Sequence, residues 1–134
     1  MITFMLDTNI CIYIIKKKPE PVLGRLKNTR ISDIGISSIT LSELAYGAEK
    51  SSRPDQNKIA LAAFLAPLEI LSYDDMAAQE YGKIRAYLDR CGTPIGTMDM
   101  LIAAHALSLN CTLVTNNEGE FNRVVSLKME NWAK

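Results

Sequence analysis

The chain contains few histidines and cysteines, and this excludes several kinds of site. With His105 as its single histidine, it cannot be a ribonuclease that works with two histidines. The three cysteines are odd in number and lack CxxC spacing, so we expect neither a disulfide framework nor a zinc site. Free thiols fit a reducing compartment, which predicts a cytoplasmic protein.

Several sequence motifs and long apolar runs are also absent. The chain has no GxSxG elbow, no Walker A loop and no GxGxxG loop. Asp7 interrupts the only early apolar run, which argues against a signal peptide and a membrane span. Fifteen basic residues balance fifteen acidic ones, so any contact with nucleic acid must depend on local basic patches.

The 134 residues are 48% hydrophobic, which is enough for one domain spanning residues 1–134. Short apolar segments alternate with amphipathic ones, and this predicts strands alternating with helices. We expect strands at residues 2–6, 34–37, 68–71 and 111–115, with a last pairing segment near residues 124–125. Helices are expected at residues 9–18, 22–26, 40–50, 58–65, 74–90 and 98–109. The alternation predicts an α/β fold with a mostly parallel central sheet of four to five strands, flanked by helices.

Four acidic residues lie near the ends of strands or in the first turns of the helices: Asp7, Glu43, Asp99 and Glu120. Because the carboxyl ends of parallel strands meet in one crevice, we expect these side chains to converge. Clustered carboxylates repel one another unless a cation neutralises them, and oxygen atoms are the ligands that Mg²⁺ prefers. The set therefore predicts a Mg²⁺ or Mn²⁺ site.

Each acid also has an ordinary structural explanation. Glu43 completes a Ser/Thr-x-x-Glu capping box that starts at Thr40. Asp7 could cap the next helix, and Asp99 could complement a helix dipole. Glu120 could be a solvated surface residue, and His105, on an alanine-rich helix, is expected to be structural.

Four ordered motifs together resemble a known family. They are MLDTN at residues 5–9, SSITLSEL at 37–44, IGTMD with IAAH between 95 and 105, and LVTNN with EF between 113 and 121. Together they are similar to the PIN domain of the VapC toxins of type II toxin–antitoxin pairs, including the enteric-type members. The resemblance implies an endoribonuclease that depends on Mg²⁺ or Mn²⁺ and hydrolyses RNA with metal-activated water. It also implies that tRNA, particularly the anticodon region of initiator tRNA, is cut to inhibit translation.

The resemblance also assigns roles to residues. Asp7 and Asp99 become the principal metal ligands, and Glu43 completes or positions the site. Many PIN domains carry an aspartate where this chain has Asn116 and Asn117, so the fourth acidic role falls to Glu120 or is partly lost. Hydrogen bonds that hold the carboxylates or a water would come from four neighbours, Thr8, Asn9, Thr115 and Asn116.

Partners follow from the same resemblance. It implies inhibition by a VapB-like antitoxin whose segment packs in a groove between the early helices, and a homodimer. The apolar helix at residues 59–65 is expected to be deeply buried or covered by another chain.

RNA would have to be held by local basic groups, with Tyr13 or Tyr46 available for stacking. The candidate basic residues are Lys16, Lys17, Lys18, Arg25, Lys27, Lys50, Arg53, Lys83 and Arg85.

Two other functions remain open from the sequence. A receiver-like phosphoryl-transfer domain also has an acidic pocket, but it requires a lysine at the end of a late strand, where this chain has Thr115 and Asn116. A PIN domain that binds without cleaving would fit the altered last motif.

Overall fold

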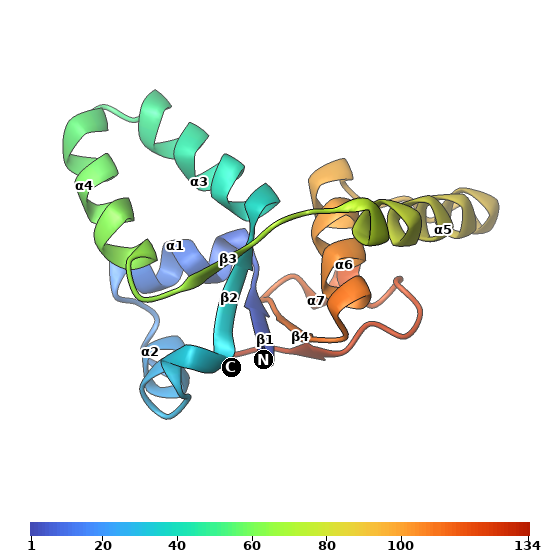
Figure 1. Ribbon diagram of the computed structural model, residues 1–134, viewed down its shortest axis with the longest axis horizontal. Helices are drawn as coiled ribbons and strands as arrows, with labels where there is room; N and C mark the ends of the chain where they lie inside the picture. Colours follow the sequence, from blue (N-terminus) through green and yellow to red (C-terminus); the bar gives the residue numbers. More distant parts are fainter.

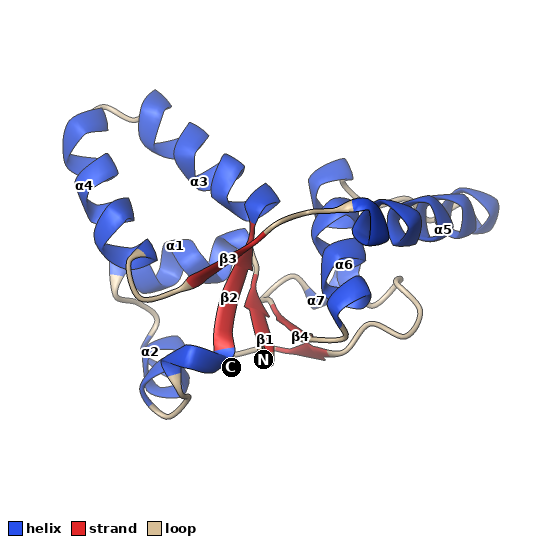
Figure 2. Ribbon diagram, in the orientation of Figure 1, coloured by secondary structure: helices blue, strands red, loops and turns tan.

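The computed structural model describes residues 1–134, and a five-stranded sheet forms its centre (Figures 1 and 2). The strands are β1 (Phe4–Leu6), β2 (Ile34–Ser37), β3 (Glu69–Leu71), β4 (Thr112–Val114) and β5 (Met129–Glu130). Their order is β3-β2-β1-β4-β5, and every neighbouring pair is parallel. The predicted α/β fold is confirmed.

Helices connect the strands and flank the sheet on two sides. They are α1 (Thr8–Lys16), α2 (Glu20–Lys27), α3 (Ser38–Lys50), α4 (Pro54–Leu65), α5 (Asp75–Cys91), α6 (Thr97–Leu109) and α7 (Glu118–Phe121), with a 3-10 turn at Ile31–Asp33. In Figure 1, α1, α3 and α4 lie to the left of the strands, and α5 and α6 lie to the right.

The core divides into two clusters because successive strand residues point to opposite faces of the sheet. Met5 and Leu113 belong to the cluster beneath α5 and α6, whereas their neighbours Leu6 and Val114 belong to the cluster beneath α1, α2 and α3. All four side chains are fully buried. The short apolar runs therefore form strands covered on both faces.

Two strands pass directly into helices at the same edge of the sheet. Asp7 follows β1 and is the N-cap of α1, while Ser37 ends β2 and is the N-cap of α3. Since β1 and β2 are parallel neighbours, these two helix starts lie close together. This edge is where the acidic residues were expected.

The last part of the chain differs from the prediction. Residues 124–125 form no strand; the fifth strand is β5, four residues further on, and it pairs with β4. Val124 instead packs its side chain into the core, which explains its apolar character. The short helix α7, which was not predicted, lies between β4 and β5.

Helix α4 was expected to be deeply buried or covered by another chain. The prediction of deep burial is wrong, because none of the residues of α4 is buried and Ile59 is 72% exposed. Its first residue is Pro54, four residues before the predicted start at residue 58. The helix contacts the core only along one side, through Leu61, Phe64 and Leu65.

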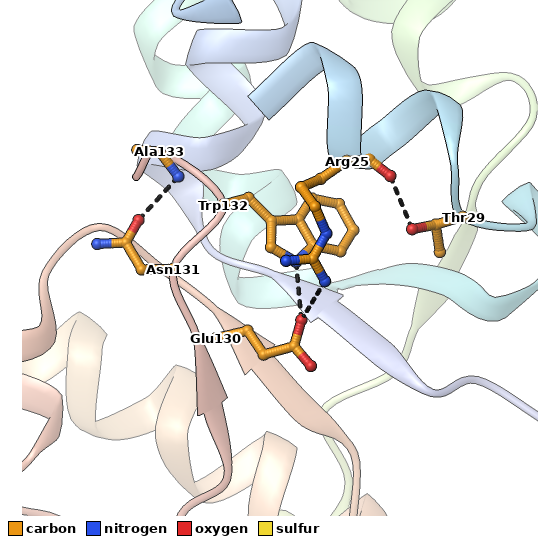
Figure 3. Close-up of polar contacts among 6 residues, drawn as sticks. All are labelled: Arg25, Thr29, Glu130, Asn131, Trp132 and Ala133. Carbon is orange, nitrogen blue, oxygen red and sulfur yellow. Dashed lines mark hydrogen bonds and ion pairs between the residues drawn. The ribbon is translucent and has the colours of Figure 1, made fainter. Parts of the chain in front are cut away.

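The C-terminal residues pack against α2 (Figure 3). Arg25 Nη2 lies 2.7 Å from Glu130 Oε1, and Trp132 Nε1 donates to the same oxygen at 3.0 Å. The Arg25 guanidinium also lies 5.2 Å from the centre of the Trp132 ring, which is fully buried. These contacts hold the residues after β5 against the α1–α2 side of the sheet.

Cys11 and Cys111 are buried and Cys91 is exposed, and all three are free thiols. None of the helices combines the length and apolar character needed to cross a membrane.

Candidate active site

Asp7 lies at the centre of the acidic edge and is only 3% exposed. Its backbone N–H donates to the Val114 carbonyl at 3.0 Å, which anchors it between β1 and β4. One carboxylate oxygen, Oδ1, accepts from the Ile10 N–H at 2.9 Å, so Asp7 does cap α1. The Thr115 hydroxyl forms a further hydrogen bond with this carboxylate.

Burial raises the pKa of Asp7, although hydrogen bonds from Thr115 and from the Ile10 backbone act in the opposite direction. The nearby charge of Glu43 raises it further. A helix cap alone explains the bond to Ile10 but not the second acid beside it. Capping and ligand binding are compatible here because a carboxylate accepts more than one bond at each oxygen.

Glu43 does not belong to a capping box, contrary to one explanation of its position. Helix α3 begins at Ser38 with Ser37 as its N-cap, and the Ser37 hydroxyl accepts from the Ile39 N–H at 3.0 Å. Glu43 therefore lies in the second turn, not the first turn that the sequence suggested. Its Oε1 accepts from the Thr8 hydroxyl at 2.5 Å, which draws the carboxylate toward the start of α1.

Asp99 and Glu120 form a pair on the other side of Asp7. Asp99 lies in the first turn of α6, whose N-cap, Gly96, has no side chain to satisfy the backbone. The pKa of Asp99 is raised to about 7, and burial is the largest cause. A hydrogen bond with Glu120 and the charges of Glu120, Asp7 and Glu43 raise it further. The same hydrogen bond lowers the pKa of Glu120.

The loop between β4 and α7 holds these groups in place. Thr115 Oγ1 accepts from the Asn117 N–H at 2.9 Å, and Asn117 Nδ2 donates to Glu120 Oε2 at 2.8 Å. The sequence alone gave Asn117 no supporting role, although its position three residues before Glu120 at a helix start is a usable signal. Asn116 bonds to Tyr13 and Asn131 rather than to an acid.

The donor set suits a hard divalent cation because it consists of carboxylate oxygens, and the charges of the neighbouring acids raise the pKa values of Asp7 and Asp99. The structure contains no group of three or more histidine, cysteine, aspartate or glutamate side chains that is arranged to hold a metal ion. Protonation of Asp99 relieves the same repulsion among the acids that a bound cation would relieve. Protons would therefore compete with a divalent cation bound at these carboxylates.

His105 is fully packed and does not face the acids. Its Nδ1 lies 2.8 Å from the Ser37 hydroxyl, and a second hydrogen bond joins its ring to the Ser72 backbone. Tyr73 packs edge-on against it, with ring centres 5.6 Å apart. The histidine thus links α6 to the end of β2 and to the segment after β3, which is a structural role.

Replacing this histidine is expected to destabilise the fold. His105→Ala would remove the partner of the buried Ser37 hydroxyl and leave a cavity beside it, which should lower the free energy of unfolding by about 2–4 kcal/mol in urea denaturation. Ser108→Ala on the same helix removes only a bond to the His105 carbonyl and should cost under about 1 kcal/mol. Equal losses in the two variants would contradict this role.

The pH dependence of stability offers a second measurement of the same contact. Burial lowers the pKa of His105 from its ordinary 6.5, so the unfolded chain takes up this proton first as the pH falls. The contribution of His105 to stability is therefore complete above pH 6.5 and is lost below it. His105→Ala should lack that part of the acid destabilisation.

Comparison with known proteins places this arrangement in a family. Residues 4–127 match the PIN domain family. The chain is 50% identical over 132 residues to the tRNA(fMet)-specific endonuclease VapC of Salmonella typhimurium, covering 98% of this chain and 99% of that protein. It is 47% identical to the ribonuclease VapC2 of Haemophilus influenzae, with 98% and 99% covered.

Solved structures agree with the sequence comparison. DNA-bound VapBC from Salmonella typhimurium superposes with a TM-score of 0.93 at 50% identity, covering 98% of this chain and 99% of that one. VapBC2 from Rickettsia felis, bound to a DNA fragment from its promoter, gives 0.89 at 46% identity, with the same coverage. The chain therefore belongs to the PIN-domain family and, within it, to the VapC ribonucleases.

Proposed function

We propose that this protein is the toxin of a type II toxin–antitoxin pair, acting in the cytoplasm as one PIN domain over residues 1–134. It hydrolyses phosphodiester bonds of tRNA, with the anticodon region of initiator tRNA as the target. One observation carries the proposal: four carboxylates interact at one edge of the sheet. The supporting relative, 50% identical over nearly the whole chain, is a tRNA(fMet)-specific endonuclease.

Asp7 and Asp99 would hold a divalent cation, Mg²⁺ or Mn²⁺. Glu43 and Glu120 would add negative charge that attracts the cation to the site. The bound cation supplies an activated water and positive charge for the phosphate in the transition state. Thr8 and Thr115 orient Glu43 and Asp7 through their hydroxyl groups, and Asn117 orients Glu120. Asn9 contributes through its backbone, which hydrogen-bonds to Asp7.

The partner would be a VapB-like antitoxin, and the assembly would contain a toxin homodimer. A groove of about 310 Å³ runs between α1, α3 and α4, lined by apolar residues that include Ile12, Leu44 and Leu61, with Glu43 in its wall. A helix or extended segment of the antitoxin fits this lining, and it would also cover the exposed α4. A basic side chain from it could pair with Glu43 and compete with the cation.

The test is incubation of the purified protein with total tRNA and Mg²⁺ or Mn²⁺, followed by the same reaction with a chelator. Discrete fragments that form only with the metal support the proposal, and initiator tRNA should be the molecule that is cut. Binding without cleavage would favour a PIN domain that has lost catalysis. Phosphate transfer to Asp7 would favour a receiver-like domain instead.

The antitoxin proposal has its own measurement. The affinity of the toxin for Mn²⁺ is measured alone and in the purified complex with the antitoxin. A weaker affinity in the complex is expected if a basic group occupies the acidic edge. An unchanged affinity would contradict that competition.

A further inference from the structure

We propose that a cavity between α1 and the start of the β4–α7 loop binds a nucleotide that flanks the cleavage site of a single-stranded RNA. The cavity has a volume of about 440 Å³ and is lined by Ile12, Tyr13, Lys16, Lys18, Pro19, Asn116 and Ala133. This volume lies in the usual range for sites that bind small molecules. The inference rests on the proposed ribonuclease function.

The cavity adjoins the acidic edge through two connections. Asn116 directly follows Thr115, whose hydroxyl bonds to Asp7. On the other wall, Lys16 ends the helix that Asp7 caps, and nine residues of helix at 1.5 Å each place it about 14 Å along the axis. In the proposed arrangement, a strand with its reacting phosphate at Asp7 extends along α1 to this cavity.

Charge distinguishes these lysines from the other basic candidates. Arg25 pairs with Glu130 and Lys83 with Glu80, while Arg85 bonds to Tyr81, Arg53 to Gln56, and Lys50 lies over the Tyr46 ring. The side chains of residues 16–18 have no ion pair, side-chain hydrogen bond or ring contact of this kind, and Lys27 is the only other candidate without one. Two of these unpaired positive charges, Lys16 and Lys18, line the cavity and match a phosphate backbone.

The backbone at the end of α1 supports this arrangement. A helix C-terminus carries partial negative charge, which would repel phosphate. Here the Lys17 N–H donates to the Ile14 carbonyl and the Lys18 N–H to the Tyr13 carbonyl, both at 3.0 Å, so two of the last carbonyls are occupied. The turn also places Lys18 beside Tyr13.

Tyr13 and Asn116 provide the surface for a base. Asn116 Nδ2 donates to the Tyr13 hydroxyl at 3.2 Å, and Asn116 Oδ1 accepts from Asn131 at 2.9 Å. Both groups are thereby held, yet the amide keeps a second N–H and the tyrosine keeps its own O–H for a ligand. An aromatic wall with polar edges and nearby cations is typical of single-strand recognition.

The neighbouring groove between α1, α3 and α4 differs in its lining, which is mainly apolar and includes the acid Glu43. Ile12 and Lys16 line both the groove and the cavity, so α1 forms the wall between them. The mainly apolar groove suits a protein segment, and the cavity with Lys16, Lys18 and Tyr13 suits RNA.

The test measures binding of a labelled single-stranded RNA in chelator over a series of salt concentrations, together with KM and kcat for tRNA. The variant is Lys16→Ala with Lys18→Ala, and its control is Lys27→Ala, an exposed lysine of α2 that also lacks an ion pair. The double variant should reduce the salt slope by about 0.7 for each phosphate that is no longer neutralised. Its KM should rise about tenfold with kcat unchanged, while the control stays like the wild type.

Stacking is measured separately with Tyr13→Leu, which keeps apolar packing but removes the ring. Its RNA affinity should fall roughly tenfold with an unchanged salt slope. Equal effects of Lys27→Ala and the double variant, or an unchanged KM and slope in the double variant, would overturn the proposal, as would no RNA binding by the wild type. RNA that binds through these residues without being cut would instead refute the proposed ribonuclease function.

Discussion

Asp7→Asn is expected to lose RNA cleavage by roughly 1,000-fold while the protein remains folded. An asparagine keeps the acceptor that caps α1, since Asn and Asp are about equally good N-caps. It removes the negative charge that attracts the cation, and losing about 4 kcal/mol of transition-state stabilisation corresponds to that factor. The rate is measured with tRNA at saturating Mg²⁺ or Mn²⁺, and folding by circular dichroism.

The matched control is Asp74→Asn. Asp74 is the N-cap of α5 and accepts from the Ala77 N–H at 3.1 Å, which repeats the local bond of Asp7 outside the acidic edge. It should keep wild-type activity. If both variants lose activity equally, or if Asp7→Asn retains it, Asp7 serves only as a helix cap and the metal-site proposal fails.

Asp99→Asn should also abolish cleavage, yet stabilise the metal-free protein. In the folded protein the pKa of Asp99 is about 7, against 3.8 as its ordinary value, so folding disfavours its charged form. Its destabilising effect is absent below about pH 4, grows as the pH rises, and is complete above pH 7. Without solvent screening, this rise in pKa corresponds to a loss of about 4 kcal/mol in the free energy of unfolding. Solvent around the half-buried carboxylate reduces the expected loss to about 1–2 kcal/mol.

The measurement is urea unfolding in chelator between pH 4 and pH 8. The difference in stability between Asp99→Asn and the wild type should widen with pH, and added divalent metal should narrow it by binding only the wild type well. Asp75→Asn is the control, because Asp75 occupies the first turn of α5 and is exposed. It should lose a little stability at neutral pH. A gain in Asp75→Asn as large as that in Asp99→Asn would show that the effect is unrelated to the cluster.

Much of the sheet could be predicted from the sequence because it depends on local patterns. Strand β2 was predicted at its observed bounds, and β1 within two residues, since short apolar runs closed by polar residues are typical of buried strands. Strand β5 was missed because Met129–Glu130 is two residues long and exists only through its pairing with β4. Such a segment has no pattern of its own.

The acidic residues could be predicted as a group, but their support could not. Strand ends and helix starts indicate where Asp7 and Asp99 lie, whereas the bond from Thr8 to Glu43 spans 35 residues and depends on how α1 and α3 pack. The capping-box motif at Thr40 was misleading for a related reason. Ser37 takes the cap, and Thr40 becomes a buried residue whose hydroxyl has no hydrogen-bond partner.

The position of β1 in the sheet affects when the enzyme can first act. Strand β1 is synthesised before the others, yet it lies between β2 and β4, and β5 pairs beyond β4. Asp7 therefore acquires its partner Thr115, and Arg25 its contact with Trp132, only after these late residues have left the ribosome. The acidic edge of a PIN-domain ribonuclease assembled in this way is complete only after most of its own chain has been synthesised.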